Sequence, residues 1–333
     1  MPGFLTHYIG GQSALRAVGS KISEYVSPAS KLYNLGTQGP DIFFYYISGF
    51  LTKRIRGVGT QMHDSGLGLY FMYLADLIKN SKSPAQRQIL FAYVAGFLVH
   101  YAVDVHAHGY VFGKTQAETG MKESARHRHF ETSVDVLMLK RMYGLKPKDF
   151  NQRKLISPKK IHLRVAADAM SEAVREVYHR DIGPIDVYRA MEAMAQFTGY
   201  LESSSGRRKR WIGHAEDMMV RSRIISALVH MQEVTDGCDY LNTQKLPWNA
   251  PWAADETRTE SFVDLFEAAV AESADMIAAL YAYTHEGMSR EELAAKIRNR
   301  SLKTGLDSDN MINGIRPIQS VSSADGVLPV QDS

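Results

Sequence analysis

The segment HYAVDVHAH (residues 100–108) places three histidines and an aspartate in nine otherwise apolar positions. In a helix His100, Asp104 and His108 would share one face, because residues four apart stack along it, whereas His106 would point elsewhere. A buried imidazole and a buried carboxylate are costly unless they are paired, and a divalent cation satisfies several such groups at once. The spacing therefore indicates a metal site.

A second segment, ARHRHFETSVD (residues 125–135), repeats this pattern. His127, Glu131 and Asp135 follow one another at intervals of four, and His129 lies off that face. A histidine and an acid at this spacing also form simple hydrogen-bonded surface pairs, so each pair alone leaves both interpretations open. Two such pairs together favour metal binding.

Three further groups stand in unusual settings: His7 in LTHYIGG, Asp41 in GTQGPDIFFYY and His63 in VGTQMHDSG. Taken singly, each histidine could be satisfied within a protein core, and Asp41 after Gly-Pro could be a turn residue that caps the next segment. However, seven of the twelve histidines precede residue 130. That asymmetry is typical of one localised site in the first part of the chain.

The elements that would position these groups are helices, because apolar residues recur at intervals of three and four and strand-like alternation is rare. The sequence predicts an all-α fold with helices over residues 13–25, 65–80, 84–106, 122–143, 158–178, 185–203, 211–231, 261–283 and 289–298. Ser83 before Pro84 forms a predicted N-cap, Ser289 with Glu292 forms a capping box, and Gly144 suits a helix end.

Three connections between the helices stand out as loops: residues 34–39, residues 106–120 and KLPWNAPW (residues 245–252). We expect one domain over residues 1–306, because no linker divides the chain. The last segment, residues 307–333, is polar and rich in Ser, Asp and Gly, which predicts a loosely held tail.

Composition excludes several classes of protein. With 39 Lys and Arg against 36 Asp and Glu, the net charge of +3 is too small to call for nucleic acid. The single cysteine, Cys238, allows no internal disulfide and no thiolate metal cluster. The apolar run at residues 89–105 carries His100 and Asp104 and is shorter than a membrane span of about 20 residues. The start MPGFLTHYIGG lacks a secretory signal pattern. We therefore expect a cytoplasmic protein without a transmembrane segment.

The sequence resembles the zinc-dependent phospholipase C family, whose all-helical fold is shared with the S1/P1-type nucleases. The stretches that carry the resemblance all precede residue 140: LTHYIGG, NLGTQGPDIFFYY, GTQMH, GFLVHYAVDVHAHGYV and RHRHFETSVD. Weaker similarities follow in LNTQKLPWNAPW, ESFVDLF and SLKTGL. The resemblance implies a multi-helix phospholipase C/P1 nuclease-like bundle with a metal cluster in a cleft.

The resemblance also implies zinc as the cofactor and assigns its ligands. The implied ligands form one set for each ion: Asp41, His63, His100 and Asp104; His108, His127 and Glu131; and His7 with the bridging Asp104. Secreted members of the family complete the third set with the amine and carbonyl of an N-terminal tryptophan, whereas this chain begins MPG. We therefore expect two or three zinc ions.

Clustered zinc ions suit the cleavage of phosphate esters, because they acidify a water molecule and neutralise phosphate oxygens. The expected function is a phospholipase C-like hydrolase of a phospholipid or another phosphate ester. Asp41 is the predicted general base, and Asp64 and Asp135 are expected to orient imidazoles from outside the ligand set. Two alternatives stay open: an S1/P1-like nuclease, with GRRKRW (residues 206–211) as its basic patch, and a metal-binding module without catalysis.

Overall fold

The computed structural model describes residues 3–46, 51–115, 121–201 and 233–308, and these ranges contain helices and loops but no β-strand. The predicted all-α class is therefore confirmed. The helices in chain order are α1 (Phe4–Ala17), α2 (Ser20–Val26), η1 (Ser27–Ala29), α3 (Ser30–Gly36), η2 (Gly39–Tyr45), α4 (Thr52–Asp64), α5 (Leu67–Asn80), α6 (Pro84–Thr115), α7 (Met121–Tyr143), η4 (Pro147–Asp149), α8 (Gln152–Leu155), α9 (Lys160–Tyr178), α10 (Pro184–Leu201), α12 (Phe262–Tyr281), η6 (Ala282–Glu286) and α13 (Arg290–Ile297).

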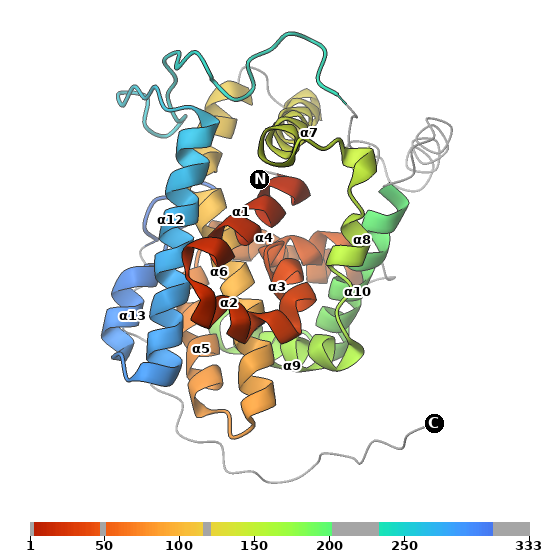
Figure 1. Cartoon of the computed structure of the whole chain (residues 1–333), viewed down its shortest axis with the longest axis vertical. Coiled ribbons are helices and arrows are strands. Elements are labelled where there is room, and N and C mark those ends of the chain that lie inside the picture. The colour runs from red at the N-terminus through yellow and green to blue at the C-terminus, as the bar shows by residue number, and fades with distance from the viewer. Residues whose placement is uncertain (1–2, 47–50, 116–120, 202–232, 309–333) are drawn as a thin grey trace.

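The long helix α6 forms the centre of the bundle. It packs most extensively against α12 and α3, and α12 runs beside it over much of its length (Figure 1). By length and composition α6 could cross a membrane, but 83% of its most apolar 18-residue window is buried inside the protein. That burial is the property of a central core helix.

Two glycines let α3 and α6 approach each other closely. A Cβ atom on Gly96 would lie 2.1 Å from the carbonyl oxygen of Tyr33, and one on Gly36 would lie 2.4 Å from the carbonyl oxygen of Tyr93. Neither backbone can yield to a side chain, so only glycine fits at either position. The contact fixes the part of α6 that lies one turn before His100.

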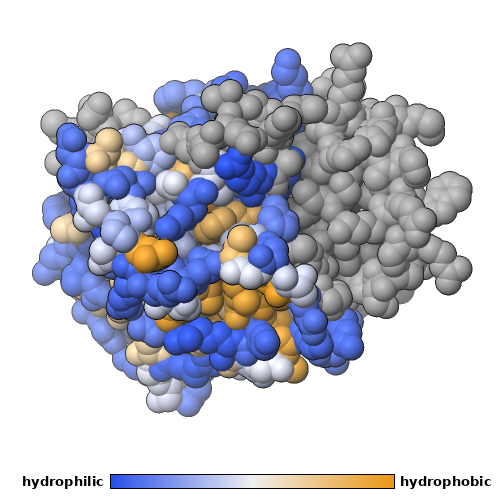
Figure 2. Space-filling model, turned by 90° about the horizontal axis from the view of Figure 1, so that it is seen from above, coloured by the Kyte–Doolittle hydropathy of each residue, from blue (hydrophilic) through white to orange (hydrophobic). Residues whose placement is uncertain are grey.

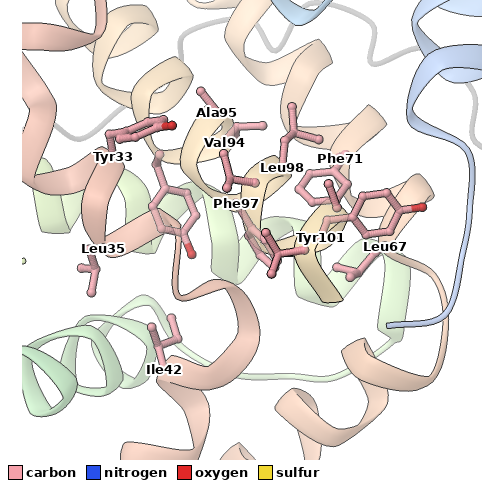
Figure 3. Close-up of a cluster of buried hydrophobic side chains, with 14 of the residues drawn as sticks. Tyr33, Leu35, Ile42, Leu67, Phe71, Val94, Ala95, Phe97, Leu98 and Tyr101 are labelled. Atoms are coloured by element: carbon pink, nitrogen blue, oxygen red, sulfur yellow. The ribbon is translucent and has the colours of Figure 1, made fainter. Parts of the chain in front are cut away.

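The hydrophobic core continues from this contact into α5 and η2. Figure 3 shows Tyr33 and Leu35 from α3, Ile42 from η2, and Phe71 from α5 around the apolar side chains of α6. These side chains are at most 1% exposed. One contiguous cluster of buried residues extends from α1 to α13. The division into a domain at residues 1–306 and a tail stays a prediction.

The predicted helix signals are present. Ser289 and Glu292 form a reciprocal capping box at the start of α13. The hydroxyl of Ser83 accepts a hydrogen bond from the backbone of Gln86, as an N-cap does. Gly144 follows α7 with a φ of +68°, the left-handed conformation that ends many helices.

Two predicted helix boundaries were wrong, and in both cases the helix continues through glycines. The helix predicted from Ser13 begins at Phe4 and passes through Gly10 and Gly11, and it ends at Ala17 before α2 starts. A Cβ on Gly11 would lie 2.6 Å from Thr37, so this glycine serves a close helix contact. Likewise, the helix predicted to end at residue 106 continues to residue 115, and most of the loop expected there is helical.

The structure also differs from the prediction in two segments between residues 34 and 64. Residues 34–39 were predicted as a loop, yet α3 ends and η2 begins within them, and α4 was not predicted at all. The KLPWNAPW segment is irregular as expected. The helix predicted over residues 211–231 lies outside the described residues.

The first residues of the expected tail contact the segment after α13. The Ser308 amide donates a hydrogen bond to the carbonyl oxygen of Asn299, which ties this residue to that segment.

Candidate metal centre

All eight residues predicted as zinc ligands lie in three groups whose candidate ligand atoms are within 4.8 Å of one another. The groups are His7, His100 and Asp104; Asp41, His63 and His100; and His108, His127 and Glu131. The elements that bring them together are α1, η2, α4, α6 and α7. Of these, α1, α6 and α7 contact one another and meet toward the upper end of Figure 1.

Asp104 lies between two imidazoles in the first group. Its Oδ1 is 3.3 Å from His7 Nε2, and its Oδ2 is 3.1 Å from His100 Nε2. All three side chains are completely buried. The spacing of four residues on α6 places His100 and Asp104 on one face, as the sequence predicted, and α1 supplies His7.

The second and third groups extend this centre in two directions. Asp41 Oδ1 lies 3.3 Å from His63 Nε2, and this pair shares His100 with the first group. In the third group, His127 Nε2 lies 2.7 Å from Glu131 Oε1. The His108 imidazole, one turn beyond Asp104 on α6, joins this pair. Since His100 belongs to two groups and Asp104 also lies 4.0 Å from His108, the groups form one connected centre.

Main-chain carbonyl oxygens orient three of the imidazoles. The Nδ1 atom of His63 lies 2.7 Å from the Gly59 oxygen, that of His100 lies 3.2 Å from the Thr37 oxygen, and that of His108 contacts the Leu302 oxygen. A carbonyl oxygen can only accept, so each Nδ1 must carry the proton. In the neutral form such a ring presents an unprotonated Nε2, which is the arrangement that metal-binding histidines use.

The buried polar atoms of the centre fit a cation better than they fit one another. Among the described residues, no hydrogen bond reaches either ring nitrogen of His7, Nε2 of His100, Oδ1 of Asp41, or either carboxylate oxygen of Asp104. The close approaches between these atoms lack hydrogen-bond geometry. Leaving such atoms buried without partners costs roughly 1–3 kcal/mol each. A divalent cation satisfies several of them together, so the donor set suits zinc.

A family model described as zinc dependent phospholipase C matches residues 6–181. The chain belongs to this zinc-dependent phospholipase C family. No curated protein and no solved structure matches the chain. The matched range contains all eight candidate ligands, from His7 to Glu131, together with the helices that carry them. Membership in the family and the donor set of the centre agree on zinc.

The protonation states around the centre are those that metal binding needs. Burial lowers the pKa of His108 to about 3, so this imidazole is neutral near pH 7. Burial alone would raise the pKa of Asp104, but the neighbouring His100 and His108 hold it well below its usual range. Similarly, the pKa of Glu131 is lowered to about 2 although burial opposes this, partly through His127. Both carboxylates are therefore ionised.

Asp135 acts on the centre through the first turn of α1. Its Oδ2 accepts from the Leu5 amide at 2.9 Å, and its Oδ1 accepts from the amide and the hydroxyl of Thr6 at 2.9 and 2.6 Å. A carboxylate at a helix start satisfies unpaired amides and the helix dipole together. Since His7 follows Thr6, Asp135 positions this candidate ligand.

The remaining acidic and histidine residues near the centre contact other groups. Asp64, which we expected to orient an imidazole, pairs with Lys303 at the surface. His106 lies 2.7 Å from Glu272, and His129 lies 3.1 Å from the hydroxyl of Tyr240. The predictions that His106 and His129 point away from the metal face agree with these contacts.

An aromatic wall borders the third group, formed by Phe112 and Trp252. The Phe112 ring lies 4.8 Å from that of His127 and 5.8 Å from that of Trp252, measured between centroids. Residues 245–252 can reach this position because Gly113 on α6 has no side chain, and a Cβ there would lie 2.3 Å from the Asn249 oxygen. Figure 2, which views the molecule from above, shows orange hydrophobic patches among blue hydrophilic residues on this face.

Sequence reasoning missed the groups that hold the ligands in place. Three of them are the carbonyl oxygens of Thr37, Gly59 and Leu302, and every residue has such an oxygen. No side-chain pattern could have revealed them. The SLKTGL stretch, noticed only as a weak family similarity, was the one sequence signal near Leu302.

Proposed function

We propose that this protein is a zinc-dependent hydrolase of phosphate esters that acts in the manner of a phospholipase C. The observation that carries the proposal is the connected centre, in which His100 belongs to two metal groups and Asp104 lies beside members of two. Zinc bound there would lower the pKa of a water molecule toward neutrality and offset the negative charge of a phosphate. Family membership supports the same chemistry.

Asp41 is the residue that we assign as general base. Its side chain is 12% exposed, whereas those of His7, His100 and Asp104 are completely buried. A carboxylate must reach both water and the metal edge to accept a proton during attack on phosphorus. Asp41 is the carboxylate of the first two groups that has access to solvent. The His127 and Glu131 side chains, 17% and 13% exposed, form a second accessible edge.

The rest of the centre excludes water and holds the ligands. The fully buried Asp104 keeps its charge beside His100, and the carbonyl of Thr37 keeps the His100 ring in one tautomer. A rigid, dry set of donors does not have to reorganise during the reaction, which is the main way in which such sites accelerate charge-forming steps.

A phospholipid is the substrate that we favour. The aromatic wall of Phe112 and Trp252 stands beside the accessible His127, where the apolar part of an amphiphilic ester could lie. The basic segment that would favour a nuclease, residues 206–211, lies outside the described residues. A salt-dependent cleavage of single-stranded DNA that exceeds the cleavage of phospholipid would favour the nuclease instead.

The test combines zinc analysis with hydrolysis of a chromogenic phosphodiester. We expect more than one zinc per chain in the parent protein and a loss of at least about 100-fold in activity for His100→Ala and Glu131→Ala. His129→Ala is the matched control, because this histidine lies on α7 beside the ligands but contacts Tyr240. Equal activity in all four proteins would contradict the proposal.

A further inference from the structure

We infer that the segment after α13, residues 298–308, is an integral part of the metal centre, and that Arg300 is the positioning residue that holds it against His108. This inference deepens the proposed function and rests on it for the identity of the metal centre. The segment contains the weakly similar SLKTGL stretch and lies more than 100 residues beyond the range that the family model matches, residues 6–181 (the family region).

One residue of the segment, Leu302, contacts two of the metal groups through its backbone. Its amide donates to the carbonyl oxygen of His63 at 3.0 Å, and its own carbonyl accepts from Nδ1 of His108. The hydroxyl of Ser301 adds a second hydrogen bond to the His63 oxygen, at 3.2 Å. Since His63 and His108 belong to different groups, Leu302 joins the second group to the third.

The carbonyl oxygen that accepts from His108 comes from a different part of the chain than those that accept from His63 and His100. The carbonyls that orient His63 and His100 belong to Gly59 and Thr37, which lie within the family region. The carbonyl that orients His108 comes from Leu302, outside that region. Hence the family region alone does not supply the acceptor that fixes the proton of His108 on Nδ1.

Arg300 anchors this segment to the core. Its side chain is only 6% exposed, and its guanidinium lies 2.6 Å from Glu272 on α12. Its amide donates to the hydroxyl of Tyr101 on α6 at 2.9 Å. Without the guanidinium, Glu272 keeps its contact with His106 but no longer holds the segment to α12. The loss of the Arg300 side chain should therefore release the segment that carries the acceptor of His108.

The expected consequence is specific to one metal group. Without the Leu302 carbonyl, the His108 proton can move to Nε2, the ring nitrogen that the Leu302 contact leaves available for a cation shared with His127 and Glu131. The imidazoles of His63 and His100 keep their own acceptors. Partners of this kind typically change metal affinity by 10- to 100-fold. We therefore expect one zinc per chain to weaken by that factor while the remaining zinc is retained.

The experiment measures zinc binding by chelator competition, together with the Nδ1 proton of His108 in ¹⁵N-histidine NMR spectra. A His108→Asn protein assigns the signal. Arg300→Met should lose this proton signal and weaken one zinc, and Arg300→Lys, which keeps a charge toward Glu272, should restore part of both. Arg298→Ala is the matched control, because it removes the exposed Arg298–Asp307 ion pair of the same segment.

A second variant addresses the segment without removing a buried charge. Gly305 has a φ of +71°, and a Cβ there would lie 2.6 Å from the Val105 oxygen on α6. Gly305→Ala should therefore push the segment away from α6 and weaken the same zinc. If either variant keeps the parent helix content, the Nδ1 proton signal and full zinc affinity, the inference is overturned. None of these measurements uses a substrate, so a protein that binds zinc but hydrolyses no phosphate ester would contradict only the proposed function.

Discussion

The imidazole of His7 is stacked on that of His100, with ring centroids 4.1 Å apart and an angle of 21° between the rings. Their Nε2 atoms approach different oxygens of the same carboxylate, Asp104. The two histidines come from α1 and α6, 93 positions apart in sequence, yet they present their nitrogens side by side. A cation at this point would be held from both helices at once.

Asp104→Asn tests this arrangement directly. The amide occupies the same volume but carries no charge, and its NH₂ group would face one of the two imidazoles. We expect the zinc content to fall by at least one ion per chain and the hydrolytic activity to fall by at least about 100-fold. Elemental analysis and the chromogenic assay measure both. Unchanged zinc content would show that Asp104 is not a ligand.

Gly96→Ala tests the close contact between α3 and α6. The added methyl group would meet the Tyr33 carbonyl at 2.1 Å, so the helices must separate, and we expect a loss of about 1–3 kcal/mol in the free energy of unfolding. Gly57→Ala on α4 is the control, because a Cβ there meets nothing within 4 Å. That change should leave stability equal or raise it by up to about 1 kcal/mol. Denaturant unfolding of both proteins decides the point.

The ion cluster around Glu272 predicts a pH dependence of stability. Burial would raise the pKa of Glu272, but hydrogen bonds from His106 and Arg300 lower it to about 2 from the usual 4.5. A carboxylate with a lowered pKa stabilises the fold fully above its unfolded value and loses this effect as the pH falls toward the folded value. We therefore expect stability to decline between about pH 4.5 and 2.

The measurement compares the parent with Glu272→Gln, both freed of metal so that zinc release does not contribute. The variant should be less stable at neutral pH and should show a shallower decline in acid. Parallel curves for the two proteins would mean that Glu272 contributes no pH-dependent stability.

Asp135→Ala should affect both stability and the metal centre. It leaves the buried amides of Leu5 and Thr6 without their acceptor, which costs roughly 1–3 kcal/mol for each unsatisfied group. The start of α1 should loosen, and with it the position of His7. We expect reduced thermal stability together with reduced zinc content. Ser133→Ala, which removes a hydroxyl that donates to the backbone oxygen of His129 at 2.9 Å, is a milder control on α7.

Much of the site could be predicted because its ligands obey helix periodicity. The intervals His100–Asp104 and His127–Glu131 need only a helix to bring each pair together, and the structure has both helices. Which segments meet across the bundle is a matter of tertiary packing, which periodicity does not encode. The family resemblance supplied that part, and the placement of His7, Asp41 and His63 beside α6 agrees with it.

The errors in the fold arose where glycine serves packing instead of a turn. Gly11 precedes the predicted helix start at residue 13 and Gly109 follows the predicted helix end at residue 106, yet each lies inside a helix, at the side on which another segment approaches. A glycine inside a helix costs roughly 1 kcal/mol in propensity, and a close contact can outweigh this cost. The helix-propensity cost of a glycine can be read from the sequence. The contact that offsets it forms only when the helices pack together.

The contact between Gly36 and Gly96 also has a consequence for dynamics. Because the backbones of α3 and α6 touch without intervening side chains, neither helix can open locally while the other stays in place. The amide hydrogens of residues 97–100 should therefore exchange with solvent only when the whole bundle unfolds, which makes them the slowest class to exchange in deuterated water.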